Sequence, residues 1–136
     1  MRDVLIDAGP LVAVINRRDQ YHHWATEQLK QLPSPLMTCE PVLTEAWFLL
    51  GRTNRGQEMM LQWIERGLLR VQFSLPDSQT RVIELMRQYQ SVPMSLADAC
   101  LVCLSEQRPN STVMTLDSDF RIYRRFNRLE IPIITP

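Results

Sequence analysis

The 136-residue sequence has little of the material that several common functions require. Its four glycines are scattered, which excludes the glycine-rich turn of a dinucleotide-binding fold. Its only lysine, Lys30, lies too early to serve as the late lysine of a receiver domain. The three cysteines leave no second pair for a zinc site, and we expect them to be reduced core residues of a cytoplasmic protein. No apolar run approaches the roughly 18 residues of a membrane span, so we expect no membrane partner.

Charge and size are ordinary. The 15 basic and 15 acidic residues cancel, so bulk charge gives no argument for binding to nucleic acid or to an anionic membrane. The hydrophobic fraction of 45% and the charged fraction of 22% are typical of a globular protein. A chain of this length can bury roughly two thirds of its unfolded surface. We therefore expect one domain over residues 1–136.

Apolar strand-like segments alternate with helix-like segments along the chain. The expected strands are residues 4–6, 36–39, 68–75, 112–116 and 131–135. The expected helices are residues 10–16, 21–32, 41–50, 57–66, one from a cap at Asp77 or Ser78 to about 89, and 96–106, capped by Ser95. This alternation requires crossover connections, so it predicts an α/β fold: a three-layer α/β/α sandwich with a mostly parallel central sheet.

Two acids follow directly after expected buried strands. Asp7 ends the segment VLID, and Asp117 ends the segment VMTLD. The carboxyl ends of parallel strands meet at one edge of a sheet, where ligands bind in α/β proteins. We therefore expect Asp7 and Asp117 to share that edge.

Two further acids lie in expected helices among apolar neighbours. Glu45 occurs in PVLTEAWFLL and Asp98 in SLADACLVCL, with no basic residue within five positions of either. Burying an unpaired carboxylate costs several kcal/mol, so we expect all four acids to meet in a buried pocket around a compensating cation. Oxygen ligands without a cluster of cysteine or histidine favour Mg²⁺ or Mn²⁺.

Each acid also has a purely local explanation. Asp7 could begin a turn, and Asp98 could complete a capping box with the serine three residues before it. Glu45 could complement a helix N-terminus. Asp117 could open a turn in which Asp119 is the helix cap. The sequence leaves these alternatives open for each acid taken singly.

Four segments, LIDAGPLVAVI, PVLTEAWFLL, MSLADACLVCL and VMTLDSDF, resemble in order the acidic motifs of PIN-domain ribonucleases, particularly bacterial VapC-type toxins. The resemblance implies that the metal-binding and catalytic acids are Asp7, Glu45, Asp98 and Asp117. It assigns Asp119 as a secondary acid and Thr115 and Ser95 as supporting residues. It also implies a Rossmann-like PIN fold, Mg²⁺- or Mn²⁺-dependent endonuclease activity on RNA, a cognate antitoxin and a homodimer.

The chemistry of the acids agrees with this resemblance. Phosphodiester hydrolysis needs a water made nucleophilic near neutral pH and a cation to neutralise developing charge. Carboxylate-held Mg²⁺ provides both, as one ion or two, with Asp98 or Glu45 helping to orient the attacking water.

Arginines near the acids could hold RNA phosphates. Arg121, Arg124 and Arg125 follow the last acid at near-helical spacing, and Arg17 follows the first acidic segment. A solvated face or pairing with acids is the alternative for each.

Other functions remain to be weighed. A haloacid-dehalogenase phosphatase needs a second aspartate two residues after the first, and that position is Gly9. The remaining alternatives to a toxin are a PIN-like housekeeping nuclease and a catalytically silent module that binds RNA or protein.

Overall fold

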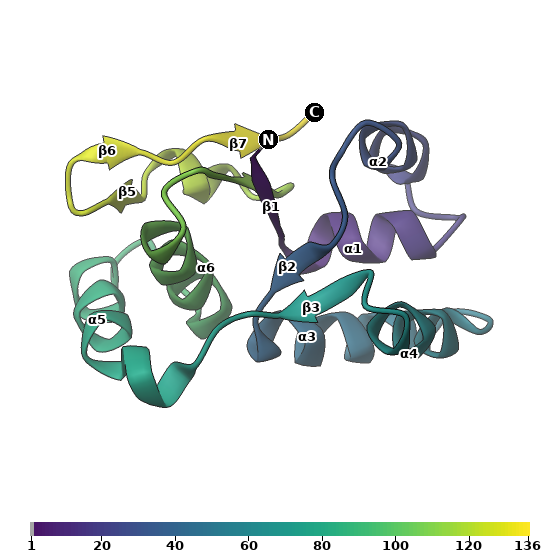
Figure 1. The fold of residues 1–136 in the computed structure, drawn as a ribbon, viewed down its shortest axis with the longest axis horizontal. Helices are drawn as coiled ribbons and strands as arrows, with labels where there is room; N and C mark the ends of the chain where they lie inside the picture. Colours follow the sequence, from purple (N-terminus) through teal and green to yellow (C-terminus); the bar gives the residue numbers. More distant parts are fainter. Residues whose placement is uncertain (1) are drawn as a thin grey trace.

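The computed structural model describes residues 2–136 and confirms the α/β fold, with one parallel sheet flanked by helices (Figure 1). The sheet has five strands in the order β3-β2-β1-β4-β7, and every neighbouring pair is parallel. The strands are β1 (Asp3–Ile6), β2 (Leu36–Thr38), β3 (Leu69–Val71), β4 (Ser111–Met114) and β7 (Ile133–Ile134).

The connections between these strands are mostly helical. The helices are α1 (Ala8–Ile15), α2 (His22–Leu29), α3 (Glu40–Leu50), α4 (Gly56–Glu65), α5 (Leu75–Gln88) and α6 (Leu96–Gln107). In Figure 1, α5 and α6 lie to the left of β1 and β2, while α1 and α2 lie to the right. In the described part of the chain, no helix is long and apolar enough to cross a membrane.

The centre of the sheet forms because its two central strands, β1 and β4, are almost wholly buried. In β1, the side chains of Val4, Leu5 and Ile6 are at most 2% exposed, as expected for a strand covered on both faces. Strand β4 is also buried throughout, and its residue Met114 is in register with Ile6. The ends of β1 and β4 therefore lie side by side.

Helix α6 packs into the core because it is apolar nearly all round. Every residue from Ala97 to Ser105 is buried, including Asp98. Ser95 caps its N-terminus, as the sequence predicts. This helix carries its acid to the same edge of the sheet as the ends of β1 and β4.

The expected strand over residues 68–75 is wrong in its length. The observed strand β3 is Leu69–Val71, and α5 begins at Leu75 with Ser74 as its cap instead of Asp77 or Ser78. The hydroxyl of Ser74 accepts a hydrogen bond from the N–H of Asp77, so Ser74 is the N-cap. The proline that follows lies in the first turn, where it is tolerated. Helix α1 likewise begins earlier than predicted, because Asp7 caps it.

The segment after β4 also differs from expectation. The near-helical spacing of its arginines reflects no long helix: a short 3₁₀ helix η1 (Ser118–Arg121) is followed by a hairpin of β5 (Arg124–Arg125) and β6 (Leu129–Glu130). The turn between them places Phe126 and Asn127 at φ of 53° and 62°, in the left-handed region. Such a turn ends any helical continuation.

Candidate active site

The site is built at the carboxyl edge of the sheet, where β1 and β4 end side by side. The N–H of Asp7 donates to the carbonyl of Met114 at 3.0 Å, which continues the pairing of the strands by one residue. Thr115 is the first residue after β4, and its hydroxyl donates to Oδ2 of Asp7 at 2.8 Å. Strand pairing thus fixes the first acid against the threonine predicted to support it.

Asp7 is held from two sides and is 8% exposed. Its Oδ1 accepts the N–H of Ala8 at 2.8 Å, so the acid that faces the site also caps α1. Burial raises the pKa of Asp7 from 3.8 to about 6, against the lowering effect of its hydrogen bonds to Thr115 and Ala8. Repulsion from Asp98 and Glu45 raises this pKa further, so the three acids are close enough to interact.

Asp98 is the second buried acid, also 8% exposed. It forms a capping box with Ser95: its N–H donates to the serine hydroxyl at 3.0 Å, and its Oδ2 accepts the serine N–H at 3.4 Å. Oδ2 also accepts the hydroxyl of Tyr123 at 2.8 Å. Burial raises the pKa of Asp98, and the charge of Asp117 adds to that effect.

Asp117 and Asp119 come from the turn after β4. The N–H of Asp117 donates to the hydroxyl of Thr115 at 3.0 Å, and Oδ1 of Asp117 accepts the N–H of Asp119 at 2.9 Å. Asp117 is therefore the cap of η1, whereas the sequence alternative gave that role to Asp119. Both side chains are half-buried.

Glu45 differs from the other acids. Its side chain on α3 is exposed, so the expectation that apolar neighbours would bury it is wrong. The neighbours Trp47 and Phe48 are themselves 40% and 68% exposed, because this part of α3 faces away from the core. Glu45 nevertheless reaches the site, since its charge raises the pKa of Asp7.

A cleft of about 560 Å³ collects all of these acids. Its lining residues are Asp7, Gly9, Glu45, Pro93, Ser95, Asp98, Leu116, Asp117 and Asp119. The lining contains five carboxylates and no lysine, arginine or histidine. Local capping and the shared cleft are therefore compatible. Asp7 and Asp117 are the N-caps of α1 and η1, Asp98 completes the capping box of α6, and all three acids line the cleft.

The donors of the cleft suit a hard cation. Among residues 2–136, no three carboxylate, imidazole or thiol groups already converge as a complete ligand set. The described residues do leave Oδ1 of Asp98 and Oδ2 of Asp117 without a hydrogen-bond donor. Unpaired carboxylate oxygens beside a buried acid fit Mg²⁺ or Mn²⁺, which prefer oxygen ligands and keep several waters.

The arginines singled out in the sequence are placed differently from one another. Arg17 and Arg121 are exposed, and Arg124 is half-buried, with its Nη1 donating to the carbonyl of Arg121 at 2.7 Å. Arg125 is 6% exposed and donates to Pro109 and Ser111, so its guanidinium serves the fold.

Tyr123 is the site residue that the sequence reasoning missed. It is fully buried and is the only described side chain outside the capping box that donates to Asp98. It lies 25 residues beyond that acid, between a 3₁₀ helix and a hairpin that no periodic pattern reveals. Its one sequence signal is an aromatic residue soon after the last acidic segment.

The fold and the cleft define a class: an α/β protein with clustered acids at the carboxyl edge of a parallel sheet. The sequence profile of the PIN domain matches residues 4–125, so the chain belongs to the PIN-domain family. Among solved structures, the chain is similar to the VapC20 toxin of Mycobacterium tuberculosis, which is described as cleaving the sarcin–ricin loop. The two share 22% identity with a TM-score of 0.77, over 86% of this chain and 92% of that one. No curated protein matches.

Proposed function

We propose that this chain is an Mg²⁺- or Mn²⁺-dependent endoribonuclease and that it acts as the toxin of a toxin–antitoxin pair. The observation that carries the proposal is the cleft lined by five carboxylates and no basic side chain. Such a concentration of negative charge is costly unless a cation compensates it. Membership of the PIN-domain family supports nuclease chemistry at this cleft.

The aspartates would hold the ion. Asp98 and Asp117 each offer an oxygen that no described group occupies, and Asp7, in the same cleft, is held by Thr115. When bound, Mg²⁺ lowers the pKa of a water and neutralises charge on the phosphate and the leaving oxygen. Asp119, which lines the same cleft, would contact the waters around the ion.

Glu45 has a separate role in this proposal. Its side chain on α3 is exposed, so it can accept a hydrogen bond from a water without giving up a structural partner. We assign it to orienting the attacking water. The positive ends of the α1 and α6 dipoles lie at the same cleft and favour the anionic phosphate.

RNA and protein partners follow from the same proposal. The exposed side chains of Arg17 and Arg121 and the half-buried side chain of Arg124 would contact RNA phosphates, and Arg125 is left out because it is buried. An antitoxin and a homodimer are supported by the likeness of the fold to a VapC toxin.

The test is cleavage of end-labelled structured RNAs, including a sarcin–ricin loop, by the full chain in Mg²⁺ or in EDTA. We expect defined fragments in Mg²⁺ or Mn²⁺, none in EDTA, and none from the variant Asp7→Asn. Fragments of equal yield in EDTA, or from Asp7→Asn, would contradict the assignment. Metal-independent RNA binding without fragments would instead identify a silent binding module.

The toxin role needs its own test. Inducible expression of the wild-type chain in a bacterial host is expected to arrest growth, and Asp7→Asn is expected to relieve that arrest at equal protein level. Active cleavage in vitro without growth arrest would favour a housekeeping nuclease.

A further inference from the structure

The hydroxyl of Tyr123 is directed at the one acid of the cleft that lies on a core helix. It donates to Oδ2 of Asp98 at 2.8 Å, and the whole tyrosine side chain is buried. A neutral donor on a carboxylate that is itself 8% exposed is a short, desolvated contact. The contact joins two segments that are distant in sequence at the floor of the cleft.

Two aromatic rings restrict the movement of the Tyr123 ring. Tyr89 lies 5.1 Å away, centroid to centroid, at an interplanar angle of 68°, and Phe120 lies 5.2 Å away at 82°. Both are edge-to-face contacts, which favour one orientation of the ring. The position of the hydroxyl is therefore defined by packing as well as by its hydrogen bond.

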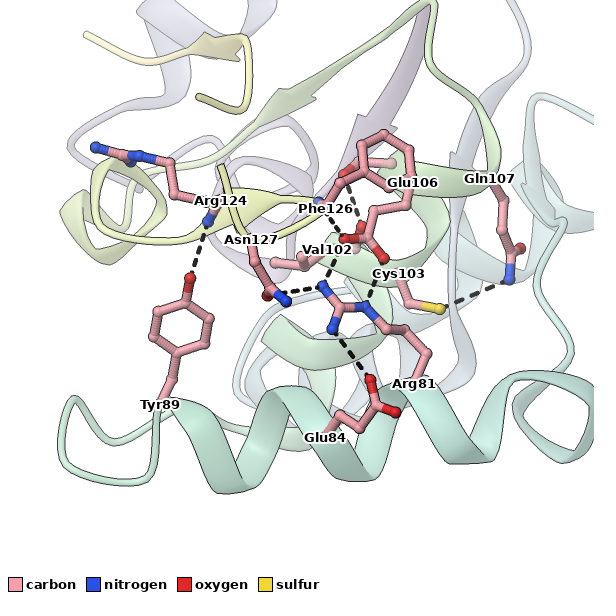
Figure 2. A network of polar contacts seen from close by, with 11 residues as sticks. Arg81, Glu84, Tyr89, Val102, Cys103, Glu106, Gln107, Arg124, Phe126 and Asn127 are labelled. Atoms are coloured by element: carbon pink, nitrogen blue, oxygen red, sulfur yellow. Dashed lines mark hydrogen bonds and ion pairs between the residues drawn. The ribbon is translucent and has the colours of Figure 1, made fainter. Parts of the chain in front are cut away.

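The backbone after Tyr123 is also tied down. The N–H of Arg124 donates to the hydroxyl of Tyr89 at 3.1 Å (Figure 2). Arg125 is the next residue of the same strand, and its guanidinium donates to the carbonyl of Ser111 at 2.9 Å. The hairpin is thus attached both to the end of α5 and to the start of β4.

An ion-pair network holds the turn of the hairpin. Figure 2 shows Arg81 of α5 between Glu84 and Glu106, and Nε and Nη2 of Arg81 each lie 2.8 Å from a carboxylate oxygen of Glu106. Oε2 of Glu106 in turn accepts the N–H of Phe126 at 2.7 Å. The network therefore connects α5, α6 and the hairpin, and its donors are satisfied internally.

The two oxygens of Asp98 consequently have different surroundings. Oδ2 accepts the N–H of Ser95 at 3.4 Å, a long contact, and the hydroxyl of Tyr123 at 2.8 Å, a short one. Oδ1 accepts no donor from residues 2–136, although Asp98 lines the cleft. The tyrosine hydroxyl makes the shorter of the two hydrogen bonds to Oδ2 that restrict rotation of the carboxylate.

We propose that Tyr123 is a positioning residue for the active site: its hydroxyl holds Oδ2 of Asp98, which keeps Oδ1 oriented as a ligand toward the cleft. This inference rests on the proposed metal-dependent function. Groups that orient a metal-binding carboxylate typically contribute 10- to 100-fold to metal affinity. Tyr123 would act through Asp98 and would not touch the RNA.

The aromatic cluster offers a matched control. Tyr123→Phe and Tyr89→Phe each remove one hydroxyl and leave the ring. Among residues 2–136, the only hydrogen bond of the Tyr89 hydroxyl is with the backbone N–H of Arg124, and no acid of the cleft is involved. Calorimetric titration with Mn²⁺ is expected to show affinity about 10-fold weaker for Tyr123→Phe and within about twofold of wild type for Tyr89→Phe. Equal affinities for the two variants, at similar thermal stability, would overturn the proposal.

Kinetics give a second readout that loss of packing would not produce. In Tyr123→Phe, the Mg²⁺ concentration for half-maximal cleavage should rise about 10-fold, while kcat at saturating Mg²⁺ and the KM for RNA stay close to wild type. A fall in kcat at saturating Mg²⁺ with an unchanged Mg²⁺ requirement would contradict a positioning role.

Two measurements separate this inference from the nuclease proposal. A crystal structure of metal-free Tyr123→Phe should show the Asp98 carboxylate in more than one orientation, and a single unchanged orientation overturns the inference even if RNA is cleaved. If the variant does not fold, NMR of the wild type replaces it: Mg²⁺ should shift the Tyr123 hydroxyl proton and leave that of Tyr89 unchanged. If the protein binds the metal and these measurements give the expected results, but RNA is not cleaved, only the proposed nuclease function is refuted.

Discussion

The hydroxyl of Thr115 links to Asp7 across the ends of the two central strands, donating to its Oδ2 at 2.8 Å. The same oxygen of Thr115 accepts the N–H of Asp117 at 3.0 Å. Thr115 is fully buried, so neither partner can be replaced by bulk water. One side chain therefore sets the separation between an acid directly after β1 and an acid after β4.

Removing this hydroxyl should loosen both acids. Thr115→Val keeps the shape of the side chain but leaves the buried Oδ2 of Asp7 and the half-buried N–H of Asp117 without this partner, which costs about 1–3 kcal/mol. We expect the midpoint of urea unfolding to fall and Mn²⁺ affinity to fall about 10-fold. Thr115→Ser retains the hydroxyl and serves as the control. Equal metal affinity in the two variants would contradict the role given to Thr115.

Asp7 should make the metal-free protein less stable as pH rises. Its pKa is raised from 3.8 to about 6, so between these values the folded state keeps a proton that the unfolded state has lost. The free energy of unfolding therefore falls as pH rises through this range, by up to about 3 kcal/mol. Unfolding in EDTA should show Asp7→Asn more stable than wild type at pH 7 and similar to it at pH 4. A difference that does not vary with pH would be inconsistent with this burial.

A divalent ion should reverse that penalty. A ligand that binds only the folded state at 100 times its Kd adds about 2.7 kcal/mol of stability. We expect Mg²⁺ or Mn²⁺ to raise the Tm of the wild-type chain and EDTA to remove the gain. Asp117→Asn should lose most of the gain, whereas Asp77→Asn, an exposed acid on α5, should keep it. The proposed metal site would be wrong if both variants responded equally.

Exposed arginines beside the cleft should add to RNA affinity. Arg121 follows the acids of η1 and is exposed, so its guanidinium can reach phosphate. In an Asp7→Asn background, Arg121→Ala should weaken RNA binding and reduce the slope of log K against log salt by about 0.7 to 1. Arg66→Ala, an exposed arginine at the end of α4, is the control and should leave the slope unchanged. Equal salt-dependence slopes for the Asp7→Asn background, Arg121→Ala and Arg66→Ala would show that Arg121 does not contact RNA phosphates.

The sequence was informative where local rules and sheet geometry coincide. Asp7 and Asp117 could be placed together because each follows a buried strand, and parallel strands end at a common edge. Ser95 could be identified as a helix cap, since capping depends on neighbouring residues alone. The sequence did not predict the order of the strands, because crossover connections indicate a parallel sheet without specifying which strands are neighbours.

Other features depend on contacts that a linear pattern does not contain. Glu45 was expected to be buried because apolar residues surround it, but α3 turns Trp47 and Phe48 outward as well. Tyr123 reaches Asp98 from a short segment between η1 and a hairpin whose turn has positive φ at residues other than glycine, which no periodic pattern predicts. The arginines after Asp117 have helical spacing, yet one of them, Arg125, is consumed by backbone carbonyls.

The pairing of β1 with β4 has a consequence for how the protein is made. The bond between Asp7 and Thr115 spans 108 residues, so the first acid is synthesised long before its partner exists. Contacts of such separation close late, since the entropy of a long loop must be overcome first. An unfinished chain on the ribosome therefore lacks the contact between Asp7 and Thr115, and the proposed catalytic centre can assemble only after residue 115 has been synthesised.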